Sequence, residues 1–115
     1  MNASQVAEVL KEMILPVQPG PYGFLIHSGV YENYRLERGS GIAGRGDVWH
    51  LREVRGGDRM GDPCRTKKEL RLVLREWAAF LDWGQKPGPE YHARRHKTRL
   101  NDGYIWVKRA ARGRG

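Results

Sequence analysis

The sequence predicts a small, single α+β domain in which helices over residues 3–15 and 66–83 pack on a three-stranded antiparallel meander. Residues 66–83 carry apolar side chains at three- and four-residue steps, which is the spacing of a helix with one buried face. Residues 22–55 contain three short apolar or alternating segments separated by glycine-containing turns, a pattern typical of antiparallel strands. At 115 residues the chain is long enough for one modest core.

The first helix is expected over residues 3–15. Asn2 or Ser4 can be its N-cap, because a short polar side chain there accepts a hydrogen bond from a free backbone N–H of the first turn. Pro16 ends the helix, and the Pro-Gly-Pro run at residues 19–21 is expected to form a stiff connector. The apolar face of this helix consists of Val6, Val9, Leu10, Met13 and Ile14.

Three strands are expected over residues 22–27, 30–38 and 47–55. The first contains a continuous apolar run and is therefore expected to be buried, whereas the other two alternate and should bury one face each. Residues 60–65 are expected to lead from the sheet into the second helix. The inward-facing residues of the two alternating strands are Tyr34, Leu36, Trp49 and Leu51.

The second helix, over residues 66–83, begins with a capping-box pattern. The Thr66 hydroxyl can accept from the N–H of Glu69, and the Glu69 carboxylate can accept from the N–H of Thr66. Gly84 and Pro87 follow where a chain leaves a helix. The stripe expected to face the sheet consists of Leu70, Val73, Leu74, Trp77, Ala78 and Leu81.

Positive charge is concentrated at the C-terminal end. Residues 86–115 hold nine Lys or Arg against two acidic residues, so they carry +7 of the net charge of +8. We therefore divide the chain into an α+β core domain, residues 1–85, and a basic hairpin with a disordered Arg-Gly tail, residues 86–115. The expected hairpin strands, 94–100 and 104–109, flank an Asn-Asp-Gly turn at residues 101–103.

This basic, aromatic hairpin predicts a non-catalytic nucleic-acid-binding protein. Lysine and arginine neutralise phosphates and release counterions, while tyrosine and tryptophan rings stack on exposed bases. These contacts are common to DNA and RNA. The stacking candidates are Tyr104 and Trp106. The phosphate contacts are expected from Lys67, Lys68, Arg94, Arg95, Lys97, Arg99, Lys108, Arg109, Arg112 and Arg114.

An acidic protein surface is the alternative partner, because arginine pairs with carboxylate as well as with phosphate. In this alternative the chain is a small phage or mobile-element inhibitor or adaptor. Its basic face would dock on an acidic surface of a host nucleic-acid-processing or defence complex, in an anti-CRISPR-like manner.

Three motifs that could carry chemistry have simpler interpretations. Residues 39–44 spell a dinucleotide fingerprint, but no helix follows to hold a pyrophosphate. His92 and His96 have the spacing of a metal pair, yet the surrounding arginines oppose a divalent ion, so contact with phosphate or solvent is expected. The helix dipole and Arg65 favour a thiolate at Cys64, but no base is signalled beside it, and a small buried side chain is expected. We expect no enzymatic activity, cofactor or metal.

The single cysteine excludes an intrachain disulfide and suits a reducing compartment. The sequence has no long apolar run, and its N-terminus lacks the charged and apolar regions of a signal peptide. We therefore expect a cytoplasmic protein with no membrane segment.

The α-β-β-β-α order expected over residues 3–83, with Thr66-Lys67-Lys68 opening the last helix, resembles a double-stranded-RNA-binding domain in architecture. The resemblance implies that this lysine pair contacts phosphates on both sides of a groove. Leucines stand where that family has an alanine pattern after the lysines, at positions 70, 72 and 74.

Overall fold

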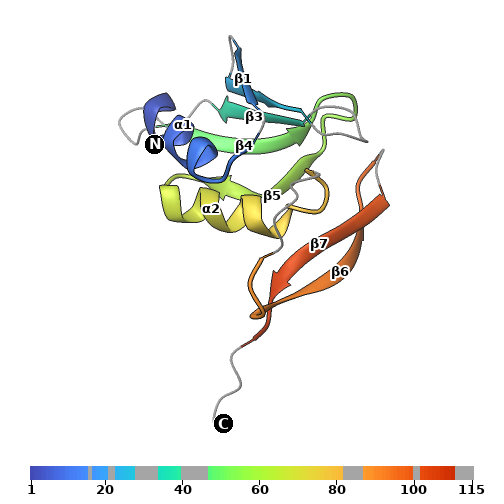
Figure 1. The fold of residues 1–115 in the computed structure, drawn as a ribbon. Helices are drawn as coiled ribbons and strands as arrows, with labels where there is room; N and C mark the ends of the chain where they lie inside the picture. The colour runs from blue at the N-terminus through green and yellow to red at the C-terminus, as the bar shows by residue number, and fades with distance from the viewer. Residues whose placement is uncertain are drawn as a thin grey trace.

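The computed structural model describes residues 1–15, 17–20, 23–27, 34–39, 47–81, 87–99 and 102–110. These residues form a small α+β domain with a five-stranded antiparallel sheet, whose strands are neighbours in sequence order, and a separate two-stranded hairpin (Figure 1). The predicted fold class is therefore confirmed. The elements are α1 (Ala3–Glu12), β1 (Val17–Gly20), β2 (Gly23–Ile26), β3 (Tyr34–Gly39), β4 (Val48–Glu53), β5 (Arg59–Cys64), α2 (Lys67–Glu76), β6 (Tyr91–Lys97) and β7 (Asp102–Lys108).

The predicted three-stranded meander is wrong in its number of strands, because both edge strands were expected to be irregular. β1 includes Pro19, which an edge strand tolerates since one side of its backbone makes no ladder bonds. β5 includes Pro63 and also Gly61 at φ 81°, and both interrupt the alternating pattern that signals a strand. In chain order, five strands therefore separate α1 from α2, whereas the double-stranded-RNA-binding architecture has three strands at this point.

α1 begins and ends with defined caps. Asn2 is the N-cap and forms a capping box with Gln5, so the first of the two expected caps is the one used. At the other end, the Ile14 N–H donates to Lys11 O (3.1 Å) and the Leu15 N–H donates to Leu10 O (3.2 Å), a Schellman motif.

This motif corrects the predicted apolar face of the first helix. Ile14 takes the left-handed position at φ 57° and is 70% exposed instead of buried. The chain reverses at that residue, and Leu15 enters the core in its place. Val6, Val9, Leu10 and Met13 are buried as expected.

α2 carries the predicted capping box. Thr66 Oγ1 accepts from the Glu69 N–H and Glu69 Oε1 accepts from the Thr66 N–H, each at 3.1 Å. The regular helix ends at Glu76, sooner than expected, because the chain tightens to an Ala78 N–H to Arg75 O bond. The whole predicted stripe is nevertheless buried.

The core lies between the two helices and one face of the sheet (Figure 1). Ion pairs from Lys67 to Glu8 and from Arg71 to Glu12 join α2 to α1 along their exposed side. Neither helix in the described part of the chain has both the length and the apolar character needed to cross a bilayer. The sheet contributes Tyr34, Leu36, Trp49, Leu51 and Met60 to the core.

The hairpin β6–β7 packs on the end of α2 through Ile105, which is 1% exposed and belongs to the same buried cluster as the helix residues. Near the loop end of the hairpin, the Arg99 N–H donates to Asp58 Oδ2 at 2.6 Å, which ties this end to the connection between β4 and β5. The predicted turn is misplaced: Asp102 and Gly103 belong to β7, where they oppose Lys97 and His96. The predicted boundary at residues 85–86 lies outside the described residues.

Candidate nucleic-acid interface

The hairpin register brings the predicted stacking and phosphate-contacting residues onto one face. Arg95 on β6 lies directly opposite Tyr104 on β7. Because side chains alternate along each strand, Lys97, Trp106 and Lys108 lie on that same face. We call Arg95, Lys97, Tyr104, Trp106 and Lys108 the outer face of the hairpin.

Charge on the outer face is unequally available. Arg95 is held by Asp102 in a two-pronged ion pair, with Nη2–Oδ2 at 2.6 Å and Nε–Oδ1 at 3.2 Å. This hydrogen bonding lowers the pKa of Asp102, so the pair stays charged. Lys97 and Lys108 are exposed and form no ion pair with any other described residue. The available cations on this face are therefore its two lysines.

The two aromatic side chains of the outer face differ in their surroundings. Tyr104 is 56% exposed, which is high for a large aromatic residue. Trp106 is half-buried and borders a groove of about 390 Å³ between α2, β5 and the hairpin. The groove is lined by Asp62, Pro63, Glu69, Leu72, Val73, Glu76, Tyr91, Trp106, Val107 and Lys108. Tyr104 is thus the ring better placed to stack on a base.

The other predicted phosphate contacts are dispersed. Arg94 lies on the opposite face of the hairpin, in register with Ile105. Burial raises the pKa of Glu76, and the charge of Arg94 offsets part of that shift. Lys67 is paired with Glu8, while Lys68 is exposed. Arg99 and Arg109 are exposed beyond the ends of the two strands, and positions 112 and 114 lie outside the described residues.

The structure also shows a cationic row that the sequence prediction missed. Arg35, Arg52 and Arg59 lie directly opposite one another on β3, β4 and β5, on the sheet face that carries neither helix. The alternation of β3 and β4 signals that two of these residues point away from the core. Their alignment depends on the pairing register and on β5, which the local pattern does not indicate.

The histidine and cysteine predictions are corrected in part. His96 packs against the rings of Trp77 and Phe80, at centroid distances of 4.9 and 6.4 Å, in place of the expected phosphate or solvent contact. Cys64 is buried, as its simpler interpretation predicts, and burial raises the pKa of its thiol to about 12, so no thiolate is favoured. Within the described ranges, no three His, Cys, Asp or Glu side chains form a group that could hold a metal.

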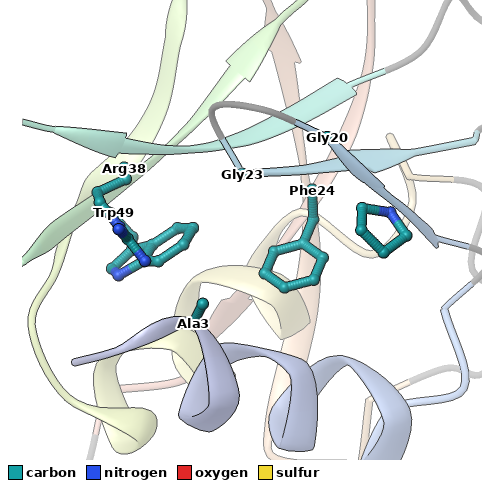
Figure 2. A pocket seen from close by; sticks show the side chains of 7 residues that line it. Ala3, Gly20, Gly23, Phe24, Arg38 and Trp49 are labelled. Atoms are coloured by element: carbon teal, nitrogen blue, oxygen red, sulfur yellow. The ribbon is translucent and has the colours of Figure 1, made fainter.

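A separate pocket of about 290 Å³ lies between α1 and the β1–β2 edge of the sheet (Figure 2). Its wall is aromatic, with Phe24 and Trp49 centroids 6.0 Å apart. The guanidinium of Arg38 lies 5.1 Å from the Trp49 ring centroid and pairs with Asp47 at 3.2 Å. The cation of this pocket is therefore already matched, and the pocket offers mainly ring and methyl surface to a ligand.

Comparisons of the chain with protein-family models, curated proteins and solved structures found no match.

Proposed function

We propose that the protein binds single-stranded nucleic acid, without catalysis, through the outer face of its hairpin. The observation that carries this proposal is the register that sets exposed Tyr104 opposite Arg95 and between the side chains of Lys97 and Trp106. An exposed ring on a face that also carries two lysines, unpaired within the described chain, can stack on a base while those lysines neutralise nearby phosphates.

The geometry suits single strands better than duplex. Tyr104 and Trp106 are two residues apart on one strand, so their attachment points are separated by roughly 6.8 Å along β7. Ring faces are useful only where bases are unstacked, whereas a duplex presents phosphates and groove edges. The hairpin is anchored by Ile105 on its other face, so the outer face is presented on a rigid support.

Fluorescence anisotropy with labelled single-stranded and duplex oligonucleotides at several salt concentrations tests the proposal. Tyr104→Ala should weaken single-strand binding by ~1–3 kcal/mol and leave duplex binding nearly unchanged. Lys97→Ala/Lys108→Ala should make the slope of log K against log[salt] shallower by roughly 1.4 units. Arg75→Ala is the matched control, because it removes an exposed cation that does not belong to the outer face. Arg75 lies on α2, and its charge acts on Glu12 of α1. No binding of the wild type at low salt would exclude the proposal.

One observation favours the alternative, an inhibitor or adaptor that binds an acidic protein. The groove beside Trp106 combines apolar Leu72, which is 42% exposed, with the carboxyl groups of Asp62 and Glu76. Carboxylates repel phosphate and acidic side chains alike, so in this alternative the groove would hold an apolar part of the protein partner while the lysines of the outer face pair with its carboxylates. A pull-down from a native host with and without nuclease treatment separates the two functions. A stoichiometric protein complex that survives nuclease supports the alternative.

A further inference from the structure

The row of Arg35, Arg52 and Arg59 places three like charges side by side on adjacent strands. Directly opposed side chains on a sheet lie close enough that like charges destabilise the pairing. Glu37 is the carboxylate that faces them, with Oε2 3.1 Å from Arg52 Nε and 3.9 Å from Arg35 Nη2. Three guanidinium groups against one carboxylate leave this group of four with a net charge of +2.

Two members of the row, Arg52 and Arg59, border a polar pocket on this face of the sheet. Glu37, Arg38, Gly39, His50, Arg52 and Arg59 line a depression of about 390 Å³ on this face. The guanidinium of Arg52 is positioned by a 2.9 Å bond from Nη1 to Gly57 O. Arg59 is exposed and forms no ion pair with the rest of the described chain. Its five donors thus remain available to a ligand.

His50 completes the pocket. A Cβ at position 39 would lie 3.0 Å from the His50 ring, so glycine at that position makes room for the imidazole. Its Nδ1 atom is buried without a hydrogen-bond partner, and so is Arg35 Nε in the adjoining row. Burial, followed by the charges of Arg59 and Arg52, lowers the pKa of His50, whose ring is therefore neutral at pH 7. A neutral imidazole can still donate one hydrogen bond to an anion.

We propose that this pocket binds a phosphate monoester dianion. Guanidinium groups present planar pairs of N–H donors that match the oxygens of phosphate. Arg52 and Arg59 supply such donors inside the pocket, and the arginine row as a whole, with its net charge of +2 after Glu37 is counted, favours a doubly charged ligand. Binding would also relieve the mutual repulsion within the arginine row. The site does not depend on nucleic-acid binding by the hairpin, because none of its residues belongs to the outer face.

Two sources could supply the dianion: a phosphorylated small molecule, or the terminal phosphate of a nucleic-acid strand. The second is sterically reasonable because Arg99, just beyond the end of β6, lies beside the connection between β4 and β5. The Arg99 N–H donates to Asp58, the residue that precedes Arg59. A strand held on the outer face could therefore extend toward the pocket.

The test is an NMR titration of the full chain with inorganic phosphate, at constant ionic strength so that general screening does not change. We expect saturable shifts centred on His50, Arg52 and Arg59. Arg59→Gln should weaken binding by about tenfold, because it removes an unpaired charged fork without disturbing an ion pair. Arg75→Gln, which removes another exposed cation, on α2, should leave binding unchanged. Absence of saturable shifts, or equal weakening by both variants, would overturn the proposal.

A second variant keeps the proposal testable if the first disturbs the fold. Glu37→Gln removes the counter-charge and should tighten phosphate binding, with a larger rise in Tm on adding phosphate than the wild type shows. Unchanged or weaker binding would count against the site.

Competition with 5′-phosphorylated and 5′-hydroxyl oligonucleotides then identifies the source of the dianion. Displacement of phosphate by the 5′-phosphorylated strand at a lower concentration than by a phosphorylated small molecule assigns the site to strand ends. Equal displacement assigns it to small molecules.

Discussion

The imidazole of His96 stands edge-on to the indole of Trp77, with ring centroids 4.9 Å apart and an interplanar angle of 85°. Trp77 also lies 5.0 Å from Phe80, so three rings join β6 to the end of α2. Edge-to-face arrangements of this kind add to the stabilisation that burial provides. The face of the hairpin opposite the proposed binding surface is therefore fastened to the core.

The first prediction tests that attachment with two neighbouring residues of β7. Ile105→Ala should lower the free energy of unfolding by ~2–5 kcal/mol, because it leaves a cavity in the shared core. Tyr104→Ala should change it by less than about 1 kcal/mol, because that ring is more than half exposed. Urea denaturation followed by tryptophan fluorescence measures both. If Ile105→Ala unfolds at the wild-type midpoint, the hairpin does not contribute to the stability of the body.

The second prediction concerns the buried stripe of α2. Leu74→Ala should destabilise the protein by ~2–5 kcal/mol, since the side chain is fully buried between the sheet and α1. Leu72→Ala is the matched control two residues earlier on the same helix, and its cost should stay within ~0.5 kcal/mol. Equal effects of the two substitutions in chemical denaturation would show that the helix is turned differently.

The third prediction concerns Ile14, a β-branched residue held in the left-handed region at φ 57°. An L-residue with a branched Cβ is strained there by ~1–2 kcal/mol, and its exposed side chain contributes little packing in return. Ile14→Asn should therefore raise the free energy of unfolding by up to ~1 kcal/mol, because asparagine tolerates this conformation at a helix C-terminus. A lower Tm for this variant in calorimetry would contradict the strain argument.

The fourth prediction follows from the pKa of the Cys64 thiol, which burial raises from 9.0 to about 12. The unfolded chain loses this proton first as the pH rises, so stability falls above pH 9 and continues to fall until about pH 12. Cys64→Ala should reduce that loss of stability. The difference between the free energies of unfolding of variant and wild type, measured from about pH 8 to 12, isolates the contribution of the thiol from those of other titrating groups.

The same burial predicts how the native thiol reacts. Cys64 should resist alkylation at pH 8 and react only after denaturation, because the thiolate is the nucleophile. Rapid modification of the folded protein in a colorimetric thiol assay would show that the side chain is accessible and the pKa is not raised.

The features that the sequence by itself determined are those that depend on local interactions. The capping box at Thr66, the choice of Asn2 or Ser4 as the cap of α1, and the stripe of α2 depend on residues at most four positions apart, so these patterns can be recognised without knowledge of the fold. The paired basic segments likewise indicated that a hairpin was present, and the charge asymmetry indicated its cationic character. The turn is misplaced because the local pattern does not show the tertiary contacts of the hairpin, in which Ile105 joins the core and His96 packs on Trp77 just past the end of α2.

Tertiary structure alone decided the features that depend on distant pairings. β5 forms because β4 offers an unpaired edge to Arg59–Cys64, although Gly61 and Pro63 weaken its own strand pattern. The alignment of Arg35, Arg52 and Arg59 then follows from the register of three strands, which separate loops connect. Cross-strand register is set by which faces the core buries, so no local pattern could bring these arginines together.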